Sequence, residues 1–121
     1  MTRPEEETMA DYLSIFRGGL DMNQASPAQL QANMDKWRSW IDTLAKAGKF
    51  TGGQPLNRDG KVLRGTKKQV TDGPYAEAKD LVGGYLVVKA GSLDEATELA
   101  RGCPIFENAD GSVEVRTIAQ M

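Results

Sequence analysis

The order of elements along the chain predicts an α+β fold of the ferredoxin-like, split βαβ type. Short β-branched and aromatic runs alternate with two segments of helical periodicity, and each helical segment begins with a capping-box signature. The predicted order is strand, helix, several strands, helix and strand. In this arrangement both helices lie on one face of an antiparallel sheet.

The length and composition of the chain fit a single domain. A chain of 121 residues with a 40% hydrophobic fraction can bury a sizeable core without disulfides or a structural metal. Residues 1–10 are polar and acidic without periodicity, so we expect a frayed or disordered N-terminal extension. Residues 11–121 are then expected to form the domain.

One strand and one long helix are predicted in the first half of the domain. Residues 12–16 form a strand-like run that ends at Gly18-Gly19, and Ser26-Pro27-Ala28-Gln29 has the residues of a capping box with proline at the first helical position. Gly48 is placed to end this helix. Apolar residues at steps of three and four predict its buried face: Leu30, Met34, Trp37, Ile41 and Leu44.

Several strands are predicted to follow this helix. Residues 50–56 contain glycines and a proline, which favour an irregular or edge strand. Asn57-Arg58-Asp59-Gly60 favours a turn into residues 61–63, and a hairpin is plausible there. Residues 69–71 lead into an Asp72-Gly73-Pro74 turn, and residues 84–88 are the most strand-like run in the chain.

The chain is predicted to end with a second helix and a last strand. Ser92-Leu93-Asp94-Glu95 has the residues of another capping box, and Gly102 and Pro104 are expected to end the helix. Residues 113–118 alternate as a strand does. The predicted buried face of the helix consists of Leu93, Ala96, Leu99 and Ala100.

The predicted strands are apolar on both faces. Leu13 and Ile15 lie on the opposite face from Tyr12 and Phe16, and the strand at 84–88 has the same property. Since two helices cover only one face, the other face would expose a large apolar patch. We therefore expect a homodimer, face to face or linked at an edge. The alternative is that loops from the 50s and 60s cover the sheet.

Charge and residue content make several kinds of partner improbable. The formal net charge is -2, so direct nucleic-acid binding is not expected, and Lys67-Lys68 with Arg64 is interpreted as a solvated strand edge. No apolar run is long enough to cross a membrane, and the acidic start does not resemble a signal peptide. With one cysteine and no histidine, we expect a cytoplasmic protein without a metal site. No nucleotide-binding loop occurs, so no cofactor is predicted.

The segment from Asp72 to Asp80 is the strongest candidate for function. It is rich in turn residues and carboxylates and interrupts the sheet, and loops held by a rigid scaffold are where function concentrates. An Asp-Gly-Pro sequence also forms a good turn for conformational reasons alone. Asp72 is therefore either a functional carboxylate or a turn residue.

A family resemblance is carried by this segment. Asp72-Gly73-Pro74-Tyr75-Ala76-Glu77-Ala78-Lys79 resembles the Asp-Gly-Pro-Phe-Ala-Glu-Thr-Lys motif of YCII-related proteins, in the branch called the DGPF family, with Tyr75 and Ala78 as departures. The similarity covers roughly residues 11–118. Further matching segments are Gly52-Gly53-Gln54-Pro55-Leu56, Gly83-Gly84-Tyr85, Cys103-Pro104 and Val113-Glu114-Val115-Arg116.

This resemblance implies a dimeric α+β barrel with a cleft beside the loop at residues 72–74. Catalysis by a His and Asp pair has been suggested for the family, but this chain has no histidine, so only a carboxylate role for Asp72 carries over. The implied function is a small-molecule-binding or cofactor-independent, enzyme-like homodimer. The alternative is a regulatory module linked to transcription initiation, since relatives occur near sigma-factor-like proteins.

Candidate site residues follow from these interpretations. Asp72 is the candidate general base. Cys103 is expected to be an inert buried thiol, and Trp37 is expected to lie in the core. Candidates for binding an anionic or polar ligand are Tyr75, Glu77, Arg17, Arg116 and Trp40.

Overall fold

Residues 9–73 and 80–120 are described by the computed structural model. The strands are β1 (Ala10–Arg17), β2 (Phe50–Pro55), β3 (Gly60–Arg64), β4 (Gln69–Gly73), β5 (Val82–Ala90) and β6 (Ser112–Thr117). The helices are α2 (Pro27–Lys46), α3 (Leu93–Ala100) and the 3-10 helix η2 (Pro104–Glu107).

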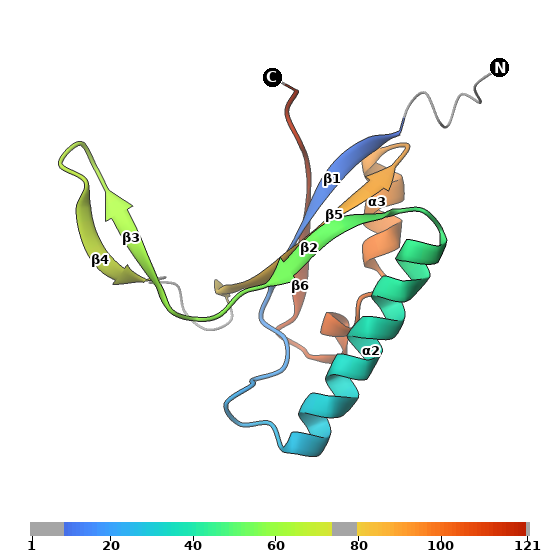
Figure 1. Ribbon diagram of the computed structural model, residues 1–121, viewed down its shortest axis with the longest axis horizontal. Coiled ribbons are helices and arrows are strands. Elements are labelled where there is room, and N and C mark those ends of the chain that lie inside the picture. The colour runs from blue at the N-terminus through green and yellow to red at the C-terminus, as the bar shows by residue number, and fades with distance from the viewer. Residues whose placement is uncertain (1–8, 74–79, 121) are drawn as a thin grey trace.

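The main sheet has the order β2-β5-β1-β6, and its neighbouring strands are antiparallel. α2 and α3 both pack on one face of it (Figure 1). This order and layering confirm the predicted ferredoxin-like split βαβ fold. The edge position of β2, with a bulge between Phe50 and Gly52, also agrees with the expectation of an irregular edge strand.

The strands are longer at some ends than the sequence indicated. β1 begins at Ala10, and β5 extends from Val82 to Ala90. Ala10 and Ala90 are partners in the register of these two antiparallel strands, so pairing extends both strands beyond their aromatic and β-branched centres. Residues 1–8, most of the predicted extension, lie outside the described residues.

The termini of α2 are built from local hydrogen bonds. The Ser26 hydroxyl accepts a hydrogen bond from the Gln29 backbone N–H at 3.1 Å, and the Ser26 N–H donates to the Gln29 side chain at 2.8 Å. At the other end, Gly48 has φ +73°, and the Lys49 N–H donates to the Leu44 carbonyl at 2.9 Å. These bonds complete the predicted capping box and a Schellman C-terminus.

α3 begins with half of the predicted capping box. The Ser92 hydroxyl accepts from the Glu95 N–H at 3.1 Å, but the Glu95 carboxylate accepts from Lys49 Nζ at 3.0 Å and from the Gly91 N–H at 3.2 Å. The Lys49 ammonium and then the Gly91 N–H lower the pKa of Glu95. The carboxylate thereby ties the start of α3 to the residue before β2.

The core between the sheet and α2 is centred on three aromatic rings. Phe16 contacts Trp37 edge to face with ring centroids 5.0 Å apart, and Trp40 lies 6.1 Å from Phe16 and 5.7 Å from Trp37. Such pairs add to the energy of burial. Trp37 and Trp40 are half-buried and pack against the core, so Trp37 lies at the core as predicted and Trp40 lies beside it.

Two residues on the predicted helix faces are exposed instead. Met34 is 48% exposed because the N-terminal part of α2 extends beyond the sheet, and Leu44 is the buried residue of this helix (Figure 1). Leu93 is 44% exposed at the first position of α3, where Ala96 and Ala100 make the buried contact. Helical periodicity locates a face but does not show where the partner surface ends.

Residues 50–56 and 61–63 do not pair with each other, so the hairpin that the turn at residues 57–60 favoured does not form. β2 pairs with β5, whereas β3 pairs with β4. The turn between β3 and β4 contains Gly65 and Lys68, with φ +76° and +54°. Lys67 and Lys68 therefore lie in this turn and not on a strand edge. We call residues Gly60–Gly73 the arm.

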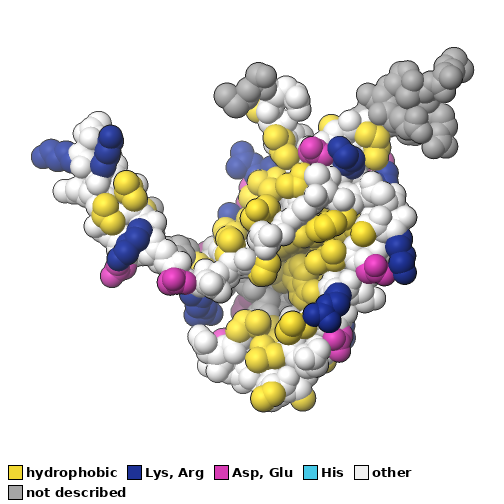
Figure 2. Space-filling model, viewed as in Figure 1, with side chains coloured by type: hydrophobic (Ala, Val, Ile, Leu, Met, Phe, Trp, Pro, Cys, Tyr) yellow, Lys and Arg dark blue, Asp and Glu magenta, His cyan; other side chains and the backbone are white. Residues whose placement is uncertain are grey.

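The arm projects away from the main sheet and does not cover it (Figure 1). Apolar side chains lie along it among charged ones (Figure 2). Leu63 and Val70 are 63% and 59% exposed. Loops from the 50s and 60s therefore leave the second face of the sheet uncovered.

We expect Phe16→Ala to destabilise the protein by about 3 kcal/mol or more, because it opens a cavity between Trp37 and Trp40. Urea unfolding followed by tryptophan fluorescence measures this change. Met34→Ala is the control and should cost less than about 0.5 kcal/mol, since Met34 is 48% exposed. Equal losses of unfolding free energy for Phe16→Ala and Met34→Ala would contradict the placement of Phe16 in the core.

Candidate functional site

The face of the sheet opposite the helices has an apolar centre. Leu13 pairs with Val87 and Ile15 with Tyr85 across the two central strands, and all four side chains are half-buried. Tyr12, Phe16, Leu86 and Val88 lie on the helix side. We call the surface formed by Leu13, Ile15, Tyr85 and Val87 the open face.

Two arginines flank the open face and share one carboxylate. Arg17 Nη1 lies 2.6 Å from one oxygen of Glu114, and Arg116 Nε lies 3.7 Å from the other. Register places Glu114 beside Ile15 and Arg116 beside Leu13. We call Arg17, Glu114 and Arg116 the arginine row. It carries a net positive charge along one edge of an apolar surface.

The structure thus brings together two of the predicted binding residues, Arg17 and Arg116. Sequence reasoning missed Glu114, which joins them. The alternation of residues 113–118 already placed Glu114 and Arg116 on one face of a strand. The sequence did not show that β6 pairs with β1, or in which register. That pairing places Glu114 and Arg116 on the same side of the sheet as the open face.

Asp72 lies on the arm, near the end of β4, and not in a turn as its sequence allowed. Its carboxylate forms an ion pair with Lys61, its partner across the hairpin, and the Asp72 side chain is 90% exposed. These two residues, with Asp59, Gly60 and Gly73, line a depression of about 380 Å³. Tyr75 and Glu77 lie outside the described residues.

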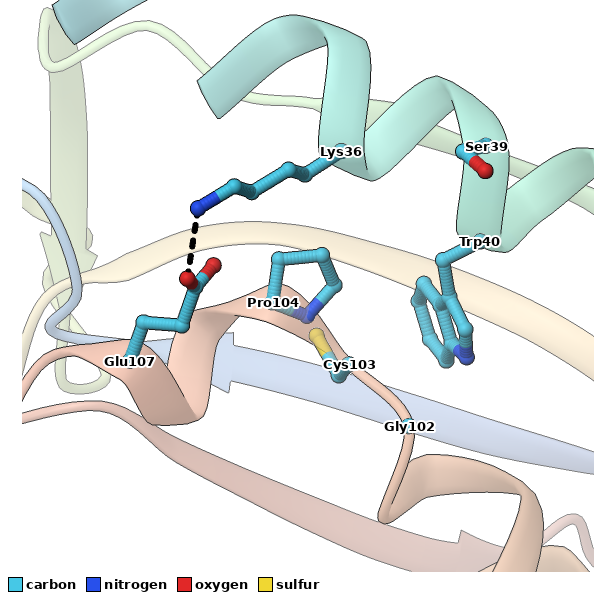
Figure 3. A pocket seen from close by; sticks show the side chains of 7 residues that line it. All are labelled: Lys36, Ser39, Trp40, Gly102, Cys103, Pro104 and Glu107. Atoms are coloured by element: carbon cyan, nitrogen blue, oxygen red, sulfur yellow. Dashed lines mark hydrogen bonds and ion pairs between the residues drawn. The ribbon is translucent and has the colours of Figure 1, made fainter. Parts of the chain in front are cut away.

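Trp40 lies on the helix side of the sheet, away from the arginine row. It lines a depression of about 420 Å³ together with Cys103 and Pro104 (Figure 3). The ion pair between Lys36 and Glu107, 2.6 Å long, closes one side. Gly102 packs against the indole, since a Cβ at this position would lie 3.1 Å from Trp40 Nε1. These contacts make Trp40 a packing residue between α2 and the turn before η2.

Cys103 is 4% exposed and belongs to the core. Burial raises the pKa of its thiol to about 12, against which the Ile105 backbone hydrogen bond acts only weakly. At neutral pH the sulfur therefore remains a protonated thiol and a poor nucleophile. This agrees with the inert role expected for it.

The described ranges contain neither a cluster of metal ligands nor a membrane-spanning helix. Among residues 9–73 and 80–120, no three His, Cys, Asp or Glu side chains gather closely enough to hold a metal ion. None of the helices in the same ranges is sufficiently long and apolar to span a membrane. The open face with the arginine row, and the arm with Asp72, are the candidate functional surfaces.

We expect Asp72→Ala to change the free energy of unfolding by less than about 0.5 kcal/mol. A 90% exposed carboxylate paired with one lysine contributes little to stability. Urea unfolding of the two proteins measures the difference. A loss of several kcal/mol would show instead that Asp72 has a structural role.

We expect Cys103 to react slowly with a thiol-specific disulfide reagent at pH 8. The thiolate fraction at a pKa of about 12 is about one-thousandth of that at the usual value of 9.0. The rate should rise by a similar factor when urea unfolds the chain. Native and unfolded rates within a factor of ten would contradict the buried thiol.

Known proteins that are similar to this chain include a solved structure and a curated relative. The structure is 5-chloro-2-hydroxyhydroquinone dehydrochlorinase from Burkholderia phenoliruptrix AC1100 in complex with 2,5-dihydroxybenzoquinone, with 19% identity, a TM-score of 0.47 and coverage of 91% of this chain and 95% of that chain. The relative is an uncharacterised protein of Rhizobium meliloti (strain 1021), 42% identical over 50 residues. Those residues are 41% of this chain and 40% of the relative, so the match spans about two fifths of each length.

The family comparison covers most of the chain. Residues 20–121 match the YCII-related domain, and this range includes α2, α3, η2 and the strands β2 to β6. This agrees with the resemblance carried by the Asp72 to Lys79 motif and its flanking segments. The chain belongs to the YCII-related domain family.

Proposed function

We propose that this chain is a cytoplasmic homodimer that binds a small anionic molecule at the open face and acts on it without a cofactor. The observation that carries the proposal is the arginine row beside the open face. Arg17 and Arg116 supply positive charge, while Leu13 and Ile15 supply an apolar surface next to it. Together these features suit an anion with an apolar body.

The geometry favours an aromatic carboxylate or phenolate as the class of ligand. A guanidinium group binds a carboxylate through paired hydrogen bonds, and one Glu114 cannot neutralise two of them. Tyr85 adds an aromatic ring with a hydroxyl group to the apolar centre. A ring could pack on the open face while its anionic group contacts Arg17 and Arg116.

Asp72 is the proposed proton acceptor. A carboxylate can take a proton from a bound hydroxyl group or from carbon beside a carbonyl, provided that it reaches hydrogen-bonding distance. Its exposure on the arm leaves the carboxylate free to approach a ligand once Lys61 is displaced or shared. Asp72 would then lie at one wall of the cleft.

Dimerisation is the second part of the proposal. The open face is left uncovered by α2, α3 and the arm. A second copy can cover this face, and two-fold symmetry then covers the open face of both subunits at once. The dimer would enclose the ligand between protein surfaces and exclude water from the anionic group.

A thermal-shift experiment with a panel of small aromatic carboxylates tests the proposed site. Binding to the folded state stabilises it by about 2.7 kcal/mol at a concentration of 100 times Kd, so a ligand should raise the unfolding midpoint of the wild type. R17A/R116A should lose this rise. Asp72→Ala should keep it and lose turnover of the same compound.

The matched control is Arg101→Ala, which removes an exposed arginine that is paired with Glu98 on α3. This variant should retain the full ligand-induced shift. A panel that stabilises none of the proteins, or that stabilises R17A/R116A as much as the wild type, would overturn the proposed binding site.

A further inference from the structure

The two faces of the arm differ in how their apolar side chains are accommodated. On one face, Val62 packs over Gly73, where a Cβ would lie 2.3 Å from Val62 Cγ2. On the other face, Leu63 and Val70 are register partners and are 63% and 59% exposed. One apolar residue is therefore covered within the arm, and a pair on the opposite face is not.

The exposed apolar pair lies on the same face as the Asp72 carboxylate. Partners across an antiparallel ladder project to one face, and residues two apart along a strand share that face. Lys61 pairs with Asp72, and Leu63 pairs with Val70. We call the surface formed by these four residues the docking face of the arm. It combines an apolar patch with an ion pair.

An isolated two-stranded hairpin is marginally stable in water, so the arm needs a partner surface. Within residues 9–73 and 80–120, β3 and β4 pack chiefly against each other and stand away from the main sheet (Figures 1 and 2). A strand rises about 3.4 Å per residue and neighbouring strands lie about 4.8 Å apart. The arm is therefore long enough to extend across a four-stranded sheet.

Local charge favours a second copy as the partner. The arginine row has a net positive charge, and the docking face presents the Asp72 carboxylate, which is exposed in the single chain. The open face offers an apolar centre for Leu63 and Val70, and the arginine row offers charges for Lys61 and Asp72.

We propose that the docking face of the arm packs on the open face of a second copy and brings Asp72 to the arginine row of that copy. This inference rests on the proposed dimer and its ligand site. It explains why Asp72 and the arginine row are joined by no contact among the described residues of one chain. Each ligand site then consists of arginines from one subunit and a carboxylate from the other.

Light scattering and sedimentation of charge-introducing variants test the docking face. The wild type should be a dimer at micromolar concentration, and L63D/V70D should raise its dissociation constant at least tenfold. The matched control is Q69D/T71D, which introduces the same two charges on the opposite face of the arm and should change it less than twofold. Far-UV circular dichroism checks that the main sheet stays folded.

The results separate the two proposals. A monomeric wild type would overturn both the dimer and arm docking. If the wild type is a dimer and L63D/V70D and Q69D/T71D have the same dissociation constant, the results would overturn arm docking alone. The arm would then be free for another partner such as nucleic acid.

Disulfide trapping between differently tagged subunits tests which surface the arm contacts. In a Cys103→Ala background, subunits with Leu63→Cys should cross-link to subunits with Ile15→Cys and form a covalent heterodimer. Thr71→Cys, on the other face of the arm, is the control and should not cross-link to Ile15→Cys. Cross-links only between two Leu63→Cys subunits would show that arms pack on each other, and would overturn the proposal.

Discussion

Alternate residues of β1 and β5 lie on opposite faces of the sheet, and α2 and α3 cover only one of these faces. This constraint separates the core of the main sheet from the candidate site. The covered face can hold the aromatic core, with Phe16 against Trp37 and Trp40. The open face leaves Leu13 and Ile15 half-buried. A surface of this kind is suited to bind another molecule.

The same constraint places charge where a ligand could use it. Charged side chains of β6 can project only to the open face, because Val113 and Val115 occupy the covered one. Glu114 and Arg116 therefore meet Arg17 across the strand pair. Strand positions fix these groups more firmly than a loop would, since each strand is held by ladder hydrogen bonds on at least one side. The arginine row is thus a rigid part of the fold.

The parts of the fold that local chemistry determines could be predicted from the sequence. Ser26 and Gln29 specify the start of α2, and Gly48 specifies its end, because each makes its hydrogen bonds within a few residues. The pairing of β2 could not be predicted, since a turn signal at residues 57–60 does not show which strand lies beside it. Lys68 gave no turn signal because a lysine rarely adopts positive φ. Arg17 and Arg116 were identified as candidates, but Glu114 needed the register of β6.

The proposed division of the site between sheet and arm would link ligand binding to association. The arginine row lies on the main sheet, whereas Asp72 lies on an arm that projects away from that sheet. If each site takes its carboxylate from the other subunit, a ligand that contacts both groups binds the dimer more tightly than the monomer. By linkage, such a ligand must strengthen the dimer by the same factor. Catalysis would then be confined to the assembled protein, because the isolated subunit binds the anion but lacks the proton acceptor beside it.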